Sequence, residues 1–256
     1  MNDALARVLP SAADSSRPWL TWYSPDERIE LTGHVLSMWH AKCAGFLTAE
    51  AGPGARVHLG MTPHWRTVTW CAGAWLAGAT PVLLDSGDSF VENLLDEPPS
   101  ISVAFRIHWL FPSADVQVLV TMGSLATHWP TPLPPLTLDG IADVMPFSDH
   151  FPPAPTDGSE PALIVPQRDG LRTTSRDALV APAQSDAVEK ALGTGARALL
   201  IREETVERAM RGVMAAWRAG LTAVLISPDA DAALVSAAAR QEGIQEGIQE
   251  GIAGPQ

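Results

Sequence analysis

The spacing of hydrophobic and polar positions predicts a strand, a helix and a second strand between residues 55 and 84. Val57 to Gly60 is an apolar run long enough for one buried strand. Thr62-Pro63 is typical of a helix start, because threonine caps and proline fits the first helical position. Apolar residues then recur at helical spacing, Gly78 supplies a left-handed stop, and residues 79–84 run apolar again. This order predicts a parallel, right-handed βαβ unit.

A hairpin and a helix are predicted before this unit. Residues 19–23 alternate and are rich in aromatics, a turn signal follows, and residues 28–31 return as a second strand. Thr32 is placed to cap an amphipathic helix that continues to about residue 50. Residues 1–16 are expected to form a short helix or a loose arm.

The same order of elements returns in the second half of the chain. Strands are predicted at residues 196–201 and 221–227, on either side of a helix at residues 204–219. The helices of both units end in Ala-Trp-x-Ala-Gly, at residues 74–78 and 216–220. We therefore predict an α/β fold with two similar Rossmann-like βαβ subdomains and mostly parallel sheets.

The residues between the two units show mixed signals. Residues 101–111 alternate and predict a strand, and residues 116–120 predict another. Residues 129–161 are rich in proline and are expected to cross the surface as an extended segment, with a short helix at residues 138–144.

This interpretation divides the chain into four parts. They are a first α/β subdomain with the hairpin at residues 1–128, the proline-rich crossover at 129–161, a second α/β subdomain at 162–240 and a tail at 241–256. The tail repeats Gln-Glu-Gly-Ile three times. Each glycine costs about 1 kcal/mol in a helix, so we expect a frayed, flexible tail, with a helix induced by a partner as the alternative.

Charge and composition exclude some partners. The formal net charge of −12 argues against a phosphate backbone, so no nucleic acid partner is expected. Residues 67–84 carry no charge, but Gly78 and Pro81 interrupt them and they divide into two elements, so no membrane span is expected.

The N-terminal residues and the cysteines favour a cytoplasmic protein. Residues 1–16 carry an early acid and lack the apolar core of a signal peptide. The two cysteines, Cys43 and Cys71, lie on predicted helices, where we expect buried thiols. This cysteine usage fits a reducing compartment.

Residues 17–84 resemble, in order, spacing and turn residues, the start of an adenylate-forming enzyme. The resemblance is carried by Glu30-Leu31-Thr32, residues 51–57, Pro63-His64-Trp65 and residues 74–79. That superfamily, the AMP-binding or acyl-CoA synthetase-like proteins, includes luciferases and the adenylation domains of peptide synthetases. The resemblance implies the two-subdomain fold of the N-terminal domain of those enzymes.

The resemblance also indicates which parts of the superfamily pattern are missing. Complete members carry an aromatic-Gly-x-Thr-Glu motif, an aspartate for the ribose and a C-terminal domain with the catalytic lysine, and this sequence shows none of them. It is most similar to short, actinobacterial-type proteins that keep only the N-terminal part.

A further segment, residues 160–181, resembles the part of the superfamily that contains the ATP-phosphate loop. The residues on either side match, but the loop between them does not. The superfamily uses glycines, small hydroxyl residues and a lysine there to wrap phosphates with backbone amides. The degenerate loop position comprises Arg168, Gly170, Arg172, Thr173 and Thr174. The two arginines could meet an anion, and the alternative is a solvated hairpin turn.

Other candidate ligand contacts lie where predicted strands end, because open α/β sheets bind ligands at the carboxyl ends of their strands. They are Thr62, His64, Trp65 and Asp85 in the first unit, with Glu203 and Asp229 in equivalent places in the second. The alternatives are a surface position beside Trp65 for His64 and a turn cap for Asp85. Asp229 is also expected to cap a last helix, over residues 232–240. The histidines show no metal-binding spacing, and no catalytic residue is assigned.

These observations predict a pseudoenzyme. It would be an acyl-CoA synthetase-like protein without the phosphate loop and the C-terminal catalytic domain, acting as a binding or scaffold module with an unknown protein partner. No cofactor is expected, with ATP, AMP or CoA as the alternatives. Two further hypotheses remain: an adenylate-forming ligase half completed in trans, and a purely structural protein that dimerises through an apolar face or the tail.

Overall fold

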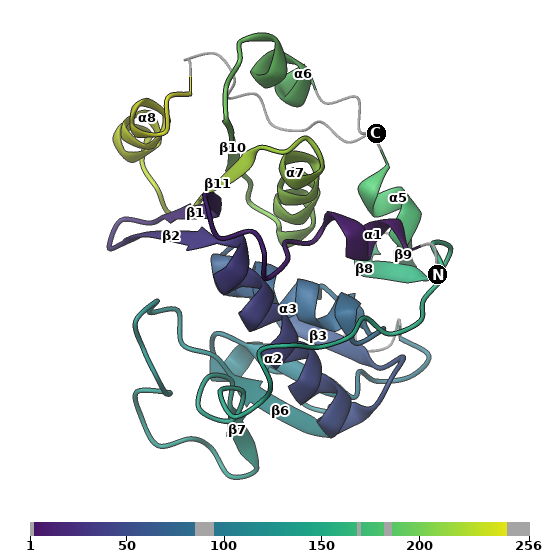
Figure 1. Ribbon diagram of the computed structural model, residues 1–256. Coiled ribbons are helices and arrows are strands. Elements are labelled where there is room, and N and C mark those ends of the chain that lie inside the picture. The colour runs from purple at the N-terminus through teal and green to yellow at the C-terminus, as the bar shows by residue number, and fades with distance from the viewer. Residues whose placement is uncertain (1–2, 85–94, 168–169, 182–185, 245–256) are drawn as a thin grey trace. The chain divides into compact units, whose positions relative to one another are not determined.

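The structure is a computed structural model that describes residues 3–84, 95–167, 170–181 and 186–244 (Figure 1). The larger sheet has the spatial order β7 (Thr137–Asp139), β6 (Val116–Leu119), β5 (Ile101–Ala104), β3 (Arg56–Gly60), β4 (Thr80–Val82), β8 (Pro161–Gln167) and β9 (Gly170–Ser175). The smaller sheet has the order β10 (Ala198–Arg202), β11 (Thr222–Ile226), β1 (Pro18–Tyr23) and β2 (Arg28–Thr32). The helices are α1 (Ala4–Val8), α2 (Gly33–Ala51), α3 (Trp65–Leu76), α5 (Arg176–Val180), α6 (Asp186–Gly193), α7 (Val206–Arg218), α8 (Ala232–Gln241) and a single 3-10 turn, η1 (Ile107–Trp109).

The residues group into two compact units, each with one sheet. The first consists of the described residues of Met1–Ala6, Met38–Met61 and Thr69–Ala178. The second consists of the described residues of Arg7–Ser37, Thr62–Val68 and Leu179–Gln256. Both units are therefore assembled from segments that lie far apart in the sequence.

The two units share a four-strand arrangement. In the first, β3, β4 and β8 run parallel and β9 is antiparallel to β8. In the second, β10, β11 and β1 run parallel and β2 is antiparallel to β1. Helix α3 connects β3 to β4, and α7 connects β10 to β11. The predicted α/β fold with two similar βαβ units and mostly parallel sheets is confirmed.

The pairing of the hairpins differs from the predicted division of the chain. The hairpin β1–β2 completes the sheet of the second unit, and the hairpin β8–β9 completes the sheet of the first. Boundaries at residues 128 and 162 would assign each hairpin to the opposite unit. Alternation along a strand reveals that a hairpin exists, but its partner across a sheet depends on contacts between distant segments.

The repeated Ala-Trp-x-Ala-Gly sequence ends a helix in the same way in both units. Gly78 and Gly220 have φ angles of 72° and 73°, in the left-handed region. The amide of the next residue donates to the carbonyl of Ala74 at 2.8 Å in α3, and to that of Ala216 at 2.9 Å in α7. This bond, six residues back to one, is the Schellman pattern, which explains why glycine recurs at the fifth position.

The tryptophan of each repeat bonds a strand of its own sheet. The indole of Trp75 donates to the carbonyl of Ala162 in β8 at 2.8 Å. The indole of Trp217 donates to the carbonyl of Trp19 in β1 at 2.9 Å. Because β8 and β1 occupy equivalent positions in the two sheets, the sequence repeat reflects a structural one.

Some predicted boundaries are wrong. Helix α3 begins at Trp65, two residues after Pro63, because His64 occupies the capping position. Helix α8 is capped by Asp231, whose side chain accepts from the amide of Leu234 at 2.8 Å, and not by Asp229. Local sequence offered two acids near this helix start, and only the backbone conformation selects between them.

The first Gln-Glu-Gly-Ile is part of the fold and not of a frayed tail. Gly243 has a φ of 66°, and the amide of Ile244 donates to the carbonyl of Ala239 at 2.8 Å. Ile244 is buried, and Glu242 accepts from the hydroxyl of Tyr23 at 2.6 Å. The glycine that disfavours a continuous helix here ends one. The other two repeats lie outside the described residues.

The segment between the βαβ units also differs from expectation. The strand predicted at residues 101–111 stops at Ala104, and η1 follows. The helix predicted at 138–144 is absent: Thr137–Asp139 is a strand, and consecutive turns follow it. Asp139 ends the strand, and its carboxylate accepts from the amides of Ile141 and Ala142 at 2.9 and 3.1 Å, which caps the first of these turns.

The end of this crossover is tied to α2 by Lys42. The ammonium group donates to the carbonyls of Met145 and Phe147 at 2.8 and 2.6 Å and pairs with Asp149 at 2.7 Å. The end of this segment therefore packs on the first unit.

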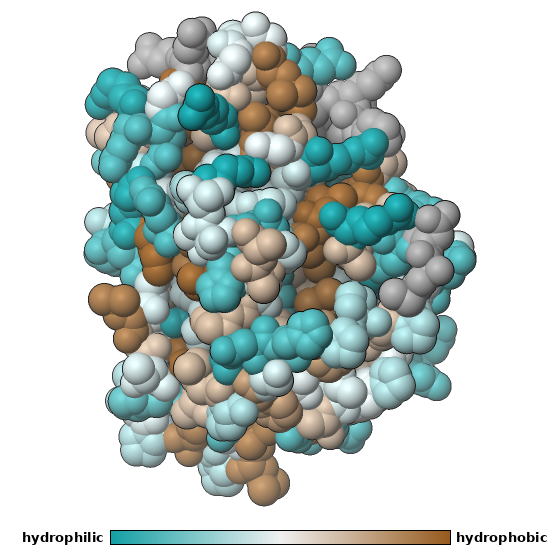
Figure 2. Space-filling model, viewed as in Figure 1, coloured by the Kyte–Doolittle hydropathy of each residue, from teal (hydrophilic) through white to brown (hydrophobic). Residues whose placement is uncertain are grey.

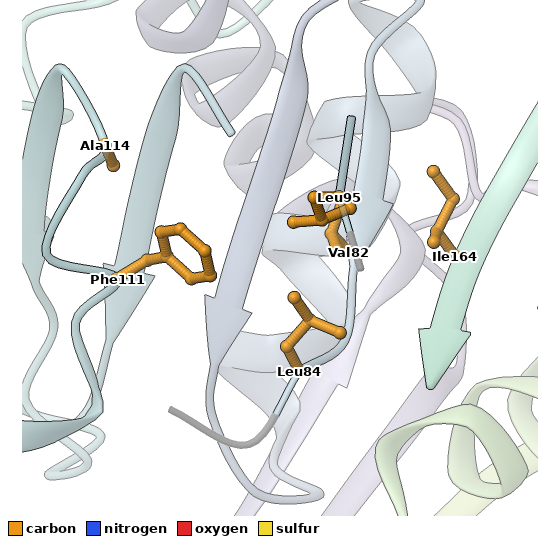
Figure 3. Packing of buried hydrophobic residues seen from close by; sticks show 6 residues of the cluster. All are labelled: Val82, Leu84, Leu95, Phe111, Ala114 and Ile164. Carbon is orange, nitrogen blue, oxygen red and sulfur yellow. The ribbon is translucent and has the colours of Figure 1, made fainter. Parts of the chain in front are cut away.

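Apolar side chains between the sheet strands and the covering segments form the core of the first unit. One cluster joins β4, β8 and residues that follow β5 (Figure 3): Val82, Leu84, Leu95, Phe111, Ala114 and Ile164. Cys43 and Cys71 are buried thiols outside any disulfide, as predicted, and burial raises the pKa of Cys71.

Candidate functional site

The carboxyl ends of six parallel strands meet along one edge of the larger sheet. The parallel run is β7, β6, β5, β3, β4 and β8. From β3 the chain adds β4 on one side and then returns to place β5 on the other, so the strand order reverses between β3 and β5. In open α/β sheets, ligands bind outside the strands at such a switch point.

The η1 turn packs against the end of β3 at the switch point. A side chain at Gly60, the last residue of β3, would lie 2.2 Å from the carbonyl oxygen of Trp109, so only glycine admits this turn. Arg106 and His108 are exposed here, and the Arg106 guanidinium lies 5.3 Å from the centroid of the half-buried Trp109 ring. Sequence reasoning missed these residues because it assigned them to a strand. Arg106 and His108, which lie close to Trp109 in the sequence, could have indicated a candidate ligand site.

A buried hydrogen-bond chain joins β3 and β5 to the residues that follow β4 and η1. The amide of Phe111 donates to the hydroxyl of Ser102 at 2.8 Å, and that oxygen lies 2.9 Å from Nδ1 of His58. Nε2 of His58 lies 3.1 Å from the carbonyl of Leu84. Because a carbonyl only accepts, Nε2 carries a proton, and Nδ1 then accepts from Ser102 in the neutral ring. Both nitrogens are engaged inside the protein, so His58 joins β3 to β5 and to the segment that follows β4.

The histidine selected from the sequence, His64, is buried in the second unit. Its Nδ1 accepts from the amide of Arg66 at 3.1 Å, which makes it the cap of α3. Its ring lies edge-on to Trp22, with centroids 4.6 Å apart. It is therefore not the surface residue of the alternative interpretation. Its sequence position beside Pro63 carried no signal of this capping role.

The neighbouring candidates divide between described and undescribed residues. Trp65 is buried, with the Arg66 guanidinium 4.4 Å from its ring centroid. Thr62 is half-buried, and its carbonyl accepts from the hydroxyl of Thr67 at 2.7 Å. Asp85 lies outside the described residues. Ligand contact by these residues remains a prediction.

The segment predicted to contain a degenerate phosphate loop forms the antiparallel pair β8–β9. Strands β8 and β9 pair in register from Leu163 opposite Thr174 to Gln167 opposite Gly170. Thr174 is buried, Thr173 is exposed, and Arg172 is half-buried. Gly170 has a φ of 145°, so the chain leaves the connection through a conformation that favours glycine. Arg168 lies outside the described residues.

A buried ion pair joins Arg176, the residue that follows β9, to Asp3 near the start of the chain. Arg176, the first residue of α5, is 1% exposed, and Asp3 is 4% exposed. Nη2 and Nε of Arg176 donate to one carboxylate oxygen of Asp3 at 2.6 and 3.2 Å, and the hydroxyl of Thr156 donates to the same oxygen at 3.0 Å. Burial alone would raise the pKa of Asp3, but the hydrogen bonds and charge of Arg176, together with hydrogen bonds from Thr156 and the Ala6 amide, lower it. Sequence reasoning missed this pair, because nothing local links residues so distant.

The two other candidate acids, Glu203 and Asp229, belong to the second unit. Glu203 is buried after β10, and Asp229 is exposed after β11. Across the described ranges, no group of three or more His, Cys, Asp or Glu side chains could hold a metal ion. Within the same ranges, no helix has the length and apolarity that a membrane crossing requires.

Large apolar side chains are exposed mainly after β5 and β6. The described residues of this kind are Ile107, Met122, Leu125, Leu136, Met145 and Leu192. Four of the six lie between residues 107 and 136. Figure 2 shows apolar side chains on one face in separate groups among hydrophilic ones.

The two α/β units and their parallel sheets define an acyl-CoA synthetase-like fold, as solved structures show. The acyl-CoA synthetase of Brucella canis matches 95% of this chain with a TM-score of 0.77 and 17% identity. The benzoate CoA ligase of Burkholderia xenovorans matches 93% with a TM-score of 0.67 and 17% identity. The N-terminal domain of FACL13 from Mycobacterium tuberculosis matches 95% with a TM-score of 0.68 and 16% identity.

The chain covers only part of these proteins. It spans 46% of the Brucella canis chain, 48% of the Burkholderia xenovorans chain and 62% of the FACL13 chain. A curated relative, the TIGR03089 family protein of Mycobacterium tuberculosis, is 40% identical over 78 residues, which are 29% of this chain and 32% of that protein. No family model matches the chain. The chain therefore shares the fold of these synthetases over about half of their length.

Proposed function

We propose that the chain is an acyl-CoA synthetase-like pseudoenzyme that acts as a cytoplasmic binding module and does not form acyl adenylates. The observation that carries this proposal is the β8–β9 hairpin. Its strands pair regularly as far as Gln167 opposite Gly170, in the segment where the sequence resemblance predicts a degenerate phosphate loop, and this pairing supports the proposal. A phosphate loop works by turning several consecutive amides toward the anion. Amides committed to an antiparallel ladder are not available for that role.

The side chains at this position support the same proposal. Thr174 is buried, and the hairpin contains no lysine between Pro161 and Ser175. The segment carries two arginines, Arg168 and Arg172, of which the structure describes Arg172. Arginine side chains alone would hold phosphate more weakly than a cradle of amides with a lysine.

Calorimetric titration with Mg²⁺-ATP, followed by AMP and CoA, tests the proposal. We expect no binding heat, and no release of pyrophosphate when the chain is incubated with ATP, Mg²⁺ and a panel of carboxylic acids. The Brucella canis synthetase is the positive control. Pyrophosphate release by the purified chain would overturn the proposal.

A ligase half completed in trans is the second candidate. It is favoured by the coverage of about half of each synthetase and by the apolar side chains exposed after β5 and β6. This candidate requires micromolar ATP binding, about −8 kcal/mol, before any partner is added. Such binding should weaken in the Arg172→Gln variant and persist in the Arg106→Gln control, which removes an exposed arginine outside the hairpin.

A further inference from the structure

The longest uncharged run of the chain lies at the β7 edge of the larger sheet. Residues 116–138 contain no Asp, Glu, Lys or Arg, although the chain as a whole carries a net charge of −12. Within this run, residues 121–136 connect β6 to β7 (Figure 1). Leu125 and Leu136 are 92% and 98% exposed there. We call the exposed side of residues 121–136 the neutral edge surface.

The neutral edge surface is held in place by the core of the first unit. The half-buried side chains of Trp129 and Leu133 pack against buried residues at and just after the ends of β5 and β6. The amide of Trp129 also donates to the carboxylate of Asp139, the last residue of β7, at 2.6 Å. The inner side of the segment is therefore fixed, and its outer side presents leucine and proline side chains to solvent.

Leu136 has an unfavourable backbone conformation as well as an exposed side chain. Its φ angle is 61°, the one positive value for a residue other than glycine in the part of the chain that the structure describes. A bulky residue is costly in this left-handed region, where glycine is not. Because the side chain is 98% exposed, packing within the chain does not offset that cost. Strain that is kept at an exposed apolar position points to a contact outside the chain.

The edge strand itself is poorly suited to accept an added strand. The amide of Thr137 donates to the carbonyl of Pro134 at 3.2 Å, and the amide of Asp139 donates to the carboxylate of Asp143 at 2.7 Å. Both ends of β7 therefore have their amides engaged by neighbouring residues of the chain, which is one way in which proteins protect an edge. A partner of this surface would be bound by side chains.

We propose that the neutral edge surface binds the same surface of a second copy of this chain in a two-fold dimer. A two-fold contact places a surface against itself, so the surface must be complementary to itself, as an uncharged apolar surface is. Two chains with a net charge of −12 repel one another, and the repulsion is least where neither surface carries a charge. The proposal does not rest on the proposed function, because it involves neither nucleotide nor acyl transfer.

The size of the surface sets the expected affinity. A standard interface takes about 20–30 residues from each partner, whereas residues 121–136 supply 16. We therefore expect a dissociation constant on the order of 10 µM.

Sedimentation velocity of the unmodified chain, from about 1 to 200 µM, brackets this value and tests the proposal. We expect the monomer to give way to a dimer across this range. The dimer should be tighter in about 0.5 M than in about 0.05 M NaCl, because salt screens the repulsion between the two acidic chains. A chain that stays monomeric throughout, or a dimer that salt dissociates, would overturn the proposal.

Charged substitutions locate the contact. Leu136→Asp and Leu125→Asp should each weaken dimerisation at least about 10-fold, because each places an unpaired charge in an apolar interface. Leu192→Asp makes the same change at a 53% exposed position on α6 of the second unit and is the matched control. An unchanged dissociation constant in the Leu136 variant, or equal weakening in the control, contradicts the assigned surface.

Leu136→Gly separates the contact from the fold. Glycine relieves the positive φ, so the melting temperature of the monomer should rise by about 2–4 °C. Loss of the side chain should weaken dimerisation about 10-fold. Hydrogen exchange of the unmodified chain should show the amides of residues 121–136 more protected at high than at low protein concentration. Full dimerisation of the glycine variant, or concentration-dependent protection confined to other segments, would refute the proposal.

Discussion

At the scale of single residues, a buried hydrogen-bond chain joins two neighbouring strands of the larger sheet. It consists of His58, Ser102 and the amide of Phe111. The sequence shows a histidine and a serine inside apolar strands, but it does not show that they meet. Their contact depends on the parallel register that places His58 opposite Ser102.

We expect Ser102→Ala to lower the free energy of unfolding by about 1–3 kcal/mol, because it leaves the Phe111 amide and a His58 nitrogen without this shared partner. Urea denaturation measures the change. Ser113→Ala, at an exposed position, is the matched control and should change stability by less than about 0.5 kcal/mol. Equal effects of the two variants would exclude the role given to Ser102.

His40 makes stability depend on acid. Burial lowers the pKa of His40 to about 3, while the unfolded chain protonates near 6.5. Below pH 6.5 the unfolded state therefore binds a proton that the folded state does not, and stability is lost as the pH falls from about 6.5 toward 3. The contribution of this group has a slope of up to about 1.4 kcal/mol per pH unit.

The His40→Leu variant should show a shallower loss of stability between pH 6.5 and 4 than the unmodified chain. Urea midpoints across this pH range measure it, and His150→Gln, at an exposed position, is the control. Parallel curves for His40→Leu and the unmodified chain would show that burial of His40 does not set the acid dependence.

At the scale of elements, the sequence predicted most helices and strands but missed features that side chains decide. The hairpin at residues 18–32, the helix that follows it and both βαβ units agree with the local periodicity. The helix predicted at residues 138–144 is replaced by a strand at Thr137–Asp139, which pairs with β6, and by consecutive turns. A short apolar run fits a strand or a helix equally well until its pairing with a distant strand decides.

The two repeat tryptophans give a matched test of the elements that they join. Trp75→Phe and Trp217→Phe each keep the aromatic ring and remove one indole donor, from Ala162 and from Trp19 respectively. We expect each to lower the free energy of unfolding by about 1–3 kcal/mol, because a strand carbonyl loses its partner. Two variants as stable as the unmodified chain would remove the indole bonds from the account of the repeat.

At the scale of the whole molecule, each hairpin completes a sheet whose other strands lie far away in the sequence. This arrangement predicts that the second half of the chain does not fold on its own. Two of the four strands of the smaller sheet, β1 and β2, lie more than 150 residues before β10. We expect a fragment of residues 162–240 to lack a cooperative thermal transition by circular dichroism. The full chain should show one. A cooperatively folded fragment would support the sequence-derived boundary at residue 162.

The sequence by itself determined most of the helices and strands and the α/β class. It also showed the resemblance to adenylate-forming enzymes. Periods of 2 and 3.6, capping residues and turn glycines act within a few residues, so they can be recognised locally. Only the tertiary structure decided which sheet each hairpin completes, that His64 is a buried cap, and that Asp3 meets Arg176. Those outcomes depend on register, burial and charge contacts between segments far apart in the chain, and the local spacing of hydrophobic residues does not reveal such contacts.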